Sequence, residues 1–497
     1  MTGIQRMHRK KKHLVSLIAI FLTGISCQEK AAIPVDLTIS VPPIPLTAVD
    51  VTSVVQAAAL ALDDATQTIA VVDRAGTPLA VYSKPGAVAA DQEVALSLAR
   101  TGAFFSNDQA PLSSRTVNSI SREHFPPGIM NTASGALFGI EHTNRGCSFN
   151  TVFAAGKVIA PATALDGVSP GNGITVTPGG VPLFQGGRLV GGLGVAGVST
   201  DRAEFAAVQG LALFPPTPAD PGVIFIDGVA LPFVEQMTRP DGSNAGSDNG
   251  VYNVVPIAGG IAPDGDLVTP IDSPTADSPK LLATDVRTII DQAIARANLT
   301  RAAIRLPLSQ RAKMVIAVTD LAGNVLGLNR MVDSTVFSID VAVAKARNVT
   351  YFSGTSVAAA DQIPGIPLGT AITNRTIGFG SQPFFPSGID GTSPGPFRDI
   401  FNFDDANPCT QGRQPANANQ NGIVFFPGSS PLYKPDVAGQ MVLVGGLGVS
   451  GDGVEQDDYV TAGGLVGYEP PEAIRADQLL INNVRLPFFK FPRNPEN

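Results

Sequence analysis

The chain has 497 residues, of which 44% are hydrophobic, and its formal net charge is −8 at pH 7. This length allows two to four domains with cores of their own, and an acidic chain whose basic tract is confined to the N-terminus is a poor nucleic-acid binder. The 52 glycines and 41 prolines indicate that much of the chain is loop.

The N-terminus has the features of an export signal. Residues 9–12 are basic, and residues 14–25 are apolar but too short to span a bilayer comfortably. The sequence therefore predicts a signal peptide over residues 1–26, lipidation of Cys27 and a Pro-rich tether over residues 27–45. An ordinary signal peptide with an incidental cysteine is the alternative. Cleavage removes five basic residues and changes the net charge from −8 to −13. The predicted location is the cell envelope, as a periplasmic or outer-surface lipoprotein.

A helix, a hairpin and a second helix follow in that order. Apolar residues at helical spacing predict a helix that begins after Thr47. Residues Thr68–Tyr82 predict a β-hairpin, because two apolar runs flank a turn that contains Gly76. A second helix is predicted over Asp91–Phe105.

The same order returns 247 residues later. Val315–Leu328 repeats the hairpin, and the register holds without a gap to Phe352, which matches Phe105. Asp73 and its match Asp320 end the first hairpin strand, where each carboxylate is expected to accept hydrogen bonds from the turn amides. The chain is therefore predicted to consist of two related halves.

Both halves then become irregular and close on a similar strand. Residues 107–180 and 353–435 are rich in Gly, Pro, Asn and Ser, as in functional covers or partly disordered loops. The closing strands, Val190–Gly197 and Val444–Gly451, each precede an acidic helical stretch. Residues 214–280 have little periodicity and predict a linker. This order of elements predicts an antiparallel α+β layer in each half.

Both closing strands contain Gly-x-Gly-x-x-Gly, a pattern that also occurs in dinucleotide-binding loops. In those loops the motif opens a βαβ unit, whereas here it ends each unit. The sequence therefore favours strands whose glycines allow a helix to pack closely.

Cys147 and Cys409 lie at similar places in the two halves. In an oxidising compartment, a disulfide between the halves is one interpretation and two separate free thiols are the other, since sequence cannot supply the geometry.

The two halves resemble the GlcG/HbpS family of small haem-associated proteins, also called DUF336. In the second half the resemblance rests on Ala317–Asp320, Arg330–Asp333, Ser338–Arg347 and Gly446–Gly451. In the first half it rests on Ala70–Asp73, Ala95–Arg100 and Gly192–Gly197. The long loops and the linker lie outside the resemblance.

The resemblance implies a fold and a role. It implies two tandem profilin-like α+β units, each an antiparallel sheet flanked by helices, with long irregular loop insertions. The units are expected at residues 46–213 and 281–485, with residues 486–497 as a tail. A tandem copy implies an intramolecular pseudo-dimer, with homo-oligomers as a further possibility, and a binding rather than a catalytic role, with haem as the leading ligand. Membrane contact is expected through the lipid anchor only, and no nucleic-acid partner is expected.

His124 and His142 are the histidines that remain after export. Imidazole ligation of haem or a metal is chemically reasonable. The second half has no histidine, however, so two equivalent histidine-ligated sites are excluded. Two loop histidines without a metal role are the alternative.

The remaining candidate ligand residues come from the resemblance and from position. The family implies a hydroxyl residue after the second helix at the haem site, and the nearest such residues are Ser113 and Ser114, beside Arg115, and Thr370 in the other half. Two further cations lie just past the second hairpin strand, where either could pair a carboxylate or be a solvated rim charge: Lys84 and Arg330. Aromatic lining is expected from Phe105 and Phe352.

Two functions from different classes fit these observations. The first is an exported protein that binds or carries haem or a related tetrapyrrole. The second is a structural or interaction lipoprotein with an empty ancestral pocket, whose loops bind protein partners. A pocket between the second helix and the sheet favours the first function, and a loop-filled pocket favours the second. No nucleophile–base constellation identifies an enzyme.

Overall fold

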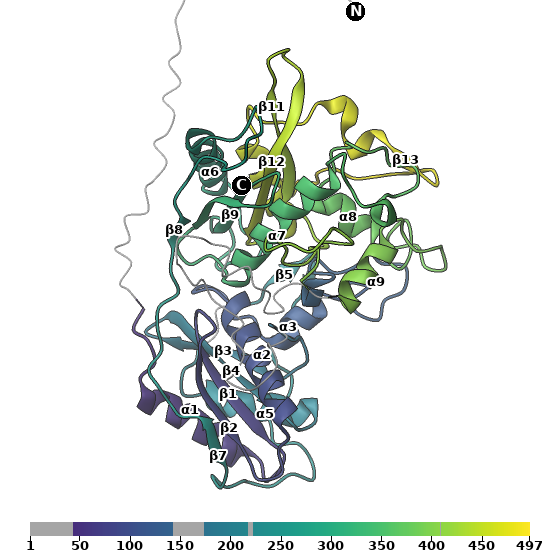
Figure 1. Ribbon diagram of the computed structural model, residues 1–497. Coiled ribbons are helices and arrows are strands. Elements are labelled where there is room, and N and C mark those ends of the chain that lie inside the picture. The colour runs from purple at the N-terminus through teal and green to yellow at the C-terminus, as the bar shows by residue number, and fades with distance from the viewer. Residues whose placement is uncertain (1–42, 143–172, 217–221, 408) are drawn as a thin grey trace, which may run out of the picture. The chain divides into compact units, whose positions relative to one another are not determined.

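The computed structural model describes residues 43–142, 173–216, 222–407 and 409–497. Its elements follow the predicted order in both halves (Figure 1). The first half contains α1 (Ala48–Ala61), β1 (Thr68–Asp73), β2 (Pro78–Ser83), α2 (Ala89–Phe105), α3 (Ser114–Ser119), β3 (Gly180–Gln185), β4 (Arg188–Ala196) and α5 (Thr200–Leu211). The segment between the halves contains β5 (Phe225–Ile226), β6 (Val229–Ala230), β7 (Val251–Val254) and β8 (Gly265–Val268). The second half contains α6 (Ala283–Ala297), β9 (Met314–Asp320), β10 (Val325–Arg330), α7 (Phe337–Phe352), α8 (Asn374–Gly380), α9 (Arg398–Ala406), β11 (Ser429–Pro435), β12 (Met441–Gly451), α10 (Val454–Gly464), β13 (Leu480–Ile481) and β14 (Val484–Arg485).

The sheet of the first half has α1 and α5 on one face and α2 on the other. Its strand order is β3-β4-β1-β2-β7, and all neighbouring strands are antiparallel. Side chains alternate along β1, so Ile69 and Val71 pack with α1 and α5, whereas Ala70 and Val72 pack with α2. Because both faces of β1 are covered, all of its residues are buried, which explains why its sequence is continuously apolar.

The second half repeats this arrangement. Its sheet has the order β11-β12-β9-β10-β8, again antiparallel throughout. Ile316 and Val318 pack with α6 and α10, and Val315 and Ala317 pack with α7. The prediction of two α+β units, each with an antiparallel sheet flanked by helices, is confirmed.

The two hairpin aspartates hold their turns as predicted. The Oδ1 atom of Asp73 accepts hydrogen bonds from the amides of Ala75 and Thr77, each at 2.9 Å. The Oδ1 atom of Asp320 accepts the equivalent pair, at 3.0 and 2.9 Å. The repeat in the sequence is therefore a repeat of hydrogen bonds.

The segment over residues 214–280, expected to be a linker, completes both sheets. Its strand β7 pairs with β2 of the first half, and its strand β8 pairs with β10 of the second half. The segment also reaches both hairpin turns, because Gly260 donates to Asp73 at 3.1 Å and Ser273 donates to Asp320 at 2.9 Å. These strands escaped prediction because each has only four residues and β7 is exposed at alternate positions.

The glycines of the closing strands lie against the backbone of the second helix in each half. A Cβ atom at Gly192 would lie 2.0 Å from the carbonyl oxygen of Ala99, and one at Gly448 would lie 2.0 Å from that of Ala342. The close-packing interpretation is confirmed, and both motifs are strand segments rather than phosphate-binding loops.

The irregular stretches also contain copies of one another. The amide of Phe125 donates to the carbonyl of Ala133 at 2.8 Å, and 260 residues later Phe385 donates to Ser393 at 2.9 Å. Each closing strand has a hairpin partner that the sequence pattern did not predict. This partner is β11 at the end of the second stretch and β3, which begins at the last residue of the first.

Several predictions concern residues outside the described part. Cys27, Cys147, the signal peptide and most of the tether belong there, so lipidation and the Cys147–Cys409 disulfide stay predictions. Among the described residues, every helix is too short or too polar to cross a membrane.

Candidate functional site

The two halves meet through an apolar contact between α2 and α7. The ring of Phe105 stacks on that of Phe337, with centroids 4.1 Å apart and an interplanar angle of 15°. The amide of Val336 donates to the carbonyl of Phe104 at 3.1 Å. Buried residues of both helices belong to one hydrophobic cluster. Phe105, predicted to line a ligand pocket, therefore contributes to the junction between the halves.

The copied loops touch each other reciprocally. The amide of Asn131 donates to the carboxylate of Asp390, and the amide of Asp390 donates to the side-chain oxygen of Asn131, each at 3.1 Å. The His124 ring stacks on Phe384, the residue 260 positions further along, with centroids 6.1 Å apart. Contacts between counterpart residues are typical of a local two-fold relation.

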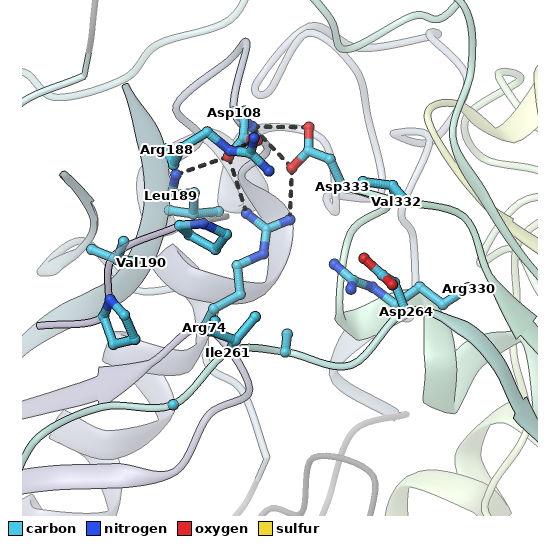
Figure 2. A pocket seen from close by; sticks show the side chains of 14 residues that line it. Arg74, Asp108, Arg188, Leu189, Val190, Ile261, Asp264, Arg330, Val332 and Asp333 are labelled. Atoms are coloured by element: carbon cyan, nitrogen blue, oxygen red, sulfur yellow. Dashed lines mark hydrogen bonds and ion pairs between the residues drawn. The ribbon is translucent and has the colours of Figure 1, made fainter. Parts of the chain in front are cut away.

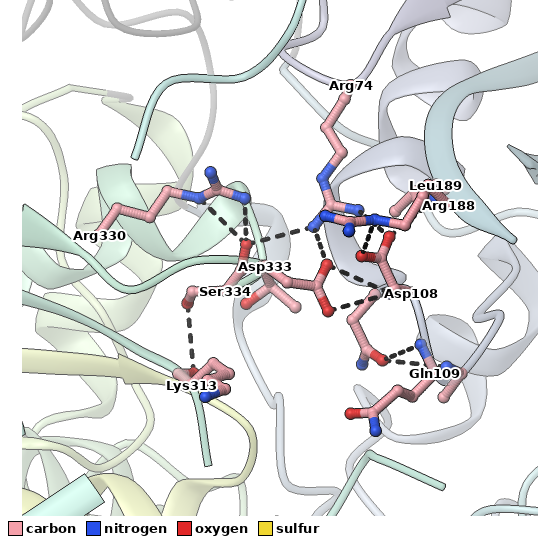
Figure 3. Close-up of polar contacts among 12 residues, drawn as sticks. Arg74, Asp108, Gln109, Arg188, Leu189, Lys313, Arg330, Asp333 and Ser334 are labelled. Carbon is pink, nitrogen blue, oxygen red and sulfur yellow. Dashed lines mark hydrogen bonds and ion pairs between the residues drawn. The ribbon is translucent and has the colours of Figure 1, made fainter. Parts of the chain in front are cut away.

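A buried ionic network crosses the same junction (Figure 3). The carboxylate of Asp333, from the second half, accepts from Arg305 at 2.6 Å and from Arg74 of the first half at 3.1 Å. Both of its oxygens also accept from the backbone amide of Asp108 at 3.2 Å. The Asp108 carboxylate lies 2.5 Å from the Nε atom of Arg188. Charged groups from both halves are thus interleaved.

Asp333 and Asp108 differ in proton affinity. Burial alone would raise the pKa of Asp333, but Arg305 and Arg74 outweigh burial and hold that pKa below its ordinary value. Burial raises the pKa of Asp108, and the neighbouring Asp333 carboxylate raises it further. Asp333 is therefore the carboxylate that neutralises the arginines most effectively.

A small pocket opens onto this network, and we call it the junction pocket (Figure 2). Its charged lining consists of Arg74, Arg188, Arg330, Asp108, Asp264 and Asp333. Its volume is about 50 Å³. About 10–15 Å³ of such cavity volume is enough to hold one water, so the pocket suits a few waters or a small ion and excludes a tetrapyrrole.

Arg330 is a predicted ligand residue that lines the junction pocket, and its side chain is almost completely buried. Its Nε atom donates to the carbonyl of Ser334 at 3.1 Å, and its Nη1 atom donates to that of Pro263 at 2.9 Å. Among the described residues, no carboxylate forms an ion pair with it. Burial lowers the pKa of Arg330 to about 9, and the positive charge of Arg74 adds to this effect.

Ser113, predicted from the family resemblance, caps a helix. Its Oγ atom accepts from the amide of Thr116 at 3.2 Å and donates to the carbonyl of Phe233. Thr373 caps α8 in the same way, because its side chain accepts from the amide of Thr376, and its hydroxyl donates to the carbonyl of Phe488 at 2.8 Å. The counterpart of Ser113 is therefore Thr373, which the sequence comparison missed because the preceding loops differ in length.

The other two predicted hydroxyls are also engaged by backbone groups. The Oγ atom of Ser114 accepts from the amide of Gly180 at 2.9 Å. The hydroxyl of Thr370 donates to the carbonyl of Pro367 at 2.7 Å.

The predicted cations Arg115 and Lys84 have partners within the fold. The guanidinium of Arg115 donates to both carboxylate oxygens of Glu204, at 2.7 and 2.9 Å, and to Glu235 at 2.8 Å. Lys84 donates to the carbonyl of Leu62, and burial lowers its pKa. Neither residue lines the junction pocket.

The two predicted histidines lie in different environments. The Nδ1 atom of His124 lies 3.0 Å from the carbonyl oxygen of Thr132. The buried His142 has its Nδ1 atom 3.0 Å from the Asp404 carboxylate and packs on Phe401, with ring centroids 4.1 Å apart. Within the described ranges, no three His, Cys, Asp or Glu side chains gather as a metal site would require.

The aromatic positions at the end of α7 are covered by loops. Phe352 packs edge-on against Phe397, with centroids 6.3 Å apart, and the hydroxyl of Tyr351 donates to Asp361 at 2.8 Å. All four residues are buried. In the second half, loop side chains therefore occupy the place where a ligand was expected.

A larger apolar cavity lies in the first half, between α3, the end of α5 and the β5–β6 hairpin. Its volume is about 440 Å³. Its lining includes Pro111, Val208, Leu211, Ile224, Phe233 and Met237. Thr116 also lines it, but its hydroxyl donates to the carbonyl of Pro232 at 2.7 Å. We call this space the α3 cavity.

Sequence reasoning missed the cross-junction residues Arg74 and Arg305. Both depart from the repeat. Arg74 stands in the hairpin turn where the second copy has Leu321, and Arg305 lies in a connection between α6 and β9 that is longer than the one between α1 and β1. A search for positions where the two copies differ would have identified both arginines.

Comparison with known proteins gives the family. The sequence matches the family described as haem degrading protein HbpS-like over residues 46–212 and 284–465. No curated protein matches the sequence.

Three solved structures are similar to parts of the chain. They are a PduOC:heme complex (19% identity, 38% of this chain and 96% of that chain, TM-score 0.24), protein ORFY of Klebsiella pneumoniae (16%, 36% and 96%, 0.24) and a double mutant of HbpS from Streptomyces reticuli (21%, 40% and 97%, 0.18). The assignment rests on the family match, because these TM-scores are low. Since its two matched segments cover more than half of the chain, the protein belongs to the HbpS-like family and carries the family's domain twice.

Proposed function

We propose that this protein binds haem or a related tetrapyrrole in the α3 cavity of its first unit. The observation that carries the proposal is the cavity itself, an apolar space of about 440 Å³. This volume lies in the range of small-molecule and cofactor pockets, which are mostly apolar with few polar groups. Membership in the HbpS-like family makes haem the leading ligand.

The lining of the α3 cavity fits such a ligand. Apolar side chains would cover the faces of the macrocycle, and Met237 supplies a thioether, one of the side-chain types that bind haem iron. The cavity also lies beside α3, the helix that begins after Ser113, where the family resemblance places the ligand. We expect one ligand per chain, bound at this cavity of the first unit.

A titration with hemin tests this proposal. We expect a Soret band that saturates near one equivalent. Met237→Ala should shift the band and weaken binding by about tenfold, equivalent to about 1.4 kcal/mol. The matched control is Met130→Ala, because Met130 is exposed like Met237 but does not line the cavity.

A flat titration, or uptake that never saturates, would end the haem proposal. If Met237→Ala left saturable hemin binding unchanged, neither Met237 nor the α3 cavity would be part of the haem site.

The second candidate is a structural or interaction protein whose loops bind protein partners. The observation in its favour is the packing of the predicted pocket residues, since Phe105 stacks on Phe337 and Phe352 packs against Phe397. A flat hemin titration would leave this function as the better one.

We also propose that the protein is exported and held at the cell envelope by a lipid on Cys27. The support is the order of basic, apolar and small residues that precedes this cysteine. We further propose that each unit is profilin-like and that the two units form an intramolecular pseudo-dimer. A disulfide between Cys147 and Cys409 would join the two halves.

Expression in a bacterial host tests the anchor. The wild-type chain should partition into detergent and carry the mass of a lipid on its N-terminal cysteine, and Cys27→Ser should move the protein into the aqueous phase. Equal partitioning of the two would contradict lipidation.

A further inference from the structure

The charged side chains around the junction pocket are equal in number but differ in how they are paired. Asp333 is bound by Arg305 and Arg74, and Asp108 is paired with Arg188. Arg330 is almost completely buried, yet among the described residues its guanidinium contacts backbone carbonyl oxygens rather than a carboxylate. A buried charge without a counter-charge is costly, and within the described part of the chain no carboxylate forms an ion pair with Arg330.

Among the described residues, two arginines of the pocket wall, Arg330 and Arg74, keep N–H donors without an acceptor. A guanidinium has five N–H donors, and Arg330 uses three of them on Ser334 and Pro263. Arg74 bonds Asp333 and Ser334 through Nη2, while its Nη1 atom lies 4.0 Å from the Asp108 carboxylate. The planar fork of arginine matches the oxygens of a carboxylate or a phosphate.

A carboxylate of the protein itself lies close enough to compete with a bound anion for these donors. Asp264 lines the pocket beside Arg330 in Figure 2, but its side chain is exposed and forms no ion pair with Arg330. An anion that entered the pocket would compete with Asp264 for the positive charge.

We propose that the junction pocket binds a small oxyanion, a phosphate or carboxylate group, between Arg330 of the second unit and Arg74 of the first. The volume of about 50 Å³ fits one such group. The bound anion supplies the missing counter-charge and joins two residues that lie on different units, so it stabilises the junction itself. Burial and the positive charge of Arg74 lower the pKa of Arg330, and an anion bound beside the guanidinium would oppose both effects.

Inorganic phosphate and acetate are the probes. Each is added to the complete chain at constant ionic strength, with chloride as the reference salt, and the melting temperature and the heat of binding are measured. At a probe concentration one hundred times its dissociation constant, we expect the melting temperature to rise by roughly 3 °C. A response to phosphate alone identifies a phosphate site, and a response to acetate identifies a carboxylate site. No difference from chloride in either measurement overturns the proposal.

Three variants locate the effect. Arg330→Lys keeps the charge but loses the fork, and it should weaken binding of the active probe by at least about tenfold. Asp264→Asn removes the competing carboxylate and should strengthen binding. The matched control is Arg485→Lys, an exposed arginine outside the pocket, which should bind as the wild type does. Calorimetry on the folded variants separates loss of the site from loss of stability. Equal affinity in all variants would place the anion elsewhere and overturn the assignment.

This site is separate from the α3 cavity, because the two spaces share no lining residue. Arg330→Lys should therefore titrate with hemin as the wild type does, so failure of one proposal leaves the other standing.

Discussion

Replacing Lys345 by Leu and Asp457 by Ala together is expected to leave the free energy of unfolding nearly unchanged or to raise it. Either replacement alone is expected to lower it by about 3–5 kcal/mol, because it leaves a buried charge without its partner. The Lys345 ammonium lies 3.0 Å from the Asp457 carboxylate and donates to the carbonyl of Val449 at 2.8 Å. Both side chains are buried.

The first half of the chain shows that the apolar pair fits this environment. Leu98 and Ala203 occupy the positions that correspond to Lys345 and Asp457. A Cβ atom at Gly179 would meet Ala203 at 3.0 Å and Leu98 at 3.4 Å, and one at the corresponding Gly428 would meet Asp457 and Lys345 at 2.6 and 2.7 Å. One fold therefore accepts either pair, and the ionic pair adds a desolvation cost that its mutual attraction only partly offsets.

The pH dependence of stability provides a second measurement of the same pair. Burial raises the pKa of Asp457 to about 7 and lowers that of Lys345. A carboxyl group whose pKa is higher in the folded state contributes stability that is fully present below its ordinary pKa of 3.8. That contribution is lost as the pH rises toward 7, so the wild type should lose stability relative to the double variant over this range.

Urea unfolding of the four proteins at several pH values checks both parts. Single replacements that each cost less than about 1 kcal/mol would show that the pair is not desolvated as described. A stability difference between wild type and double variant that does not change with pH would contradict the raised pKa of Asp457.

The second large effect is expected for Gly448→Ala, which should lower the free energy of unfolding by about 4 kcal/mol or more. The new Cβ atom would lie 2.0 Å from the carbonyl oxygen of Ala342 and 2.8 Å from the amide nitrogen of Ala346. These are backbone atoms of α7, so the helix as a whole would have to move off the sheet. Thermal and urea unfolding measure the loss.

Two further variants make this test specific. Gly439 lies in the turn between β11 and β12, where a Cβ atom would meet open space. Its backbone is left-handed, so Gly439→Ala should lower the free energy of unfolding by about 1–2 kcal/mol through backbone strain alone. Gly192→Ala creates the same clash as Gly448→Ala in the first half and should cost as much. If Gly448→Ala were no worse than Gly439→Ala, close packing would not explain the glycine motif.

The elements that sequence reasoning predicted are those with local causes. The two hairpins could be recognised because each needs an apolar run, a turn aspartate and a glycine within a few residues, and the structure shows the same amide bonds to Asp73 and Asp320. The edge strands β7 and β8 could not be recognised, because short strands at a sheet edge carry little periodicity and owe their pairing to partners far along the chain.

The candidate site residues also divide into those that local sequence predicts and those whose contacts depend on distant parts of the chain. Arg330 was a candidate because it lies just past the second hairpin strand, and in the structure it lines the junction pocket. Ser113 follows the second helix as the resemblance implied, but its hydroxyl donates to the carbonyl of Phe233, a partner 120 residues away that no local pattern specifies.

By itself, the sequence determined that the chain holds two copies of one α+β unit with glycine-lined closing strands, because repeats, turns and apolar periodicity are properties of neighbouring residues. Only the tertiary structure decided which charges meet at the junction, because Arg74 and Asp333 are 259 residues apart and no local pattern specifies their contact.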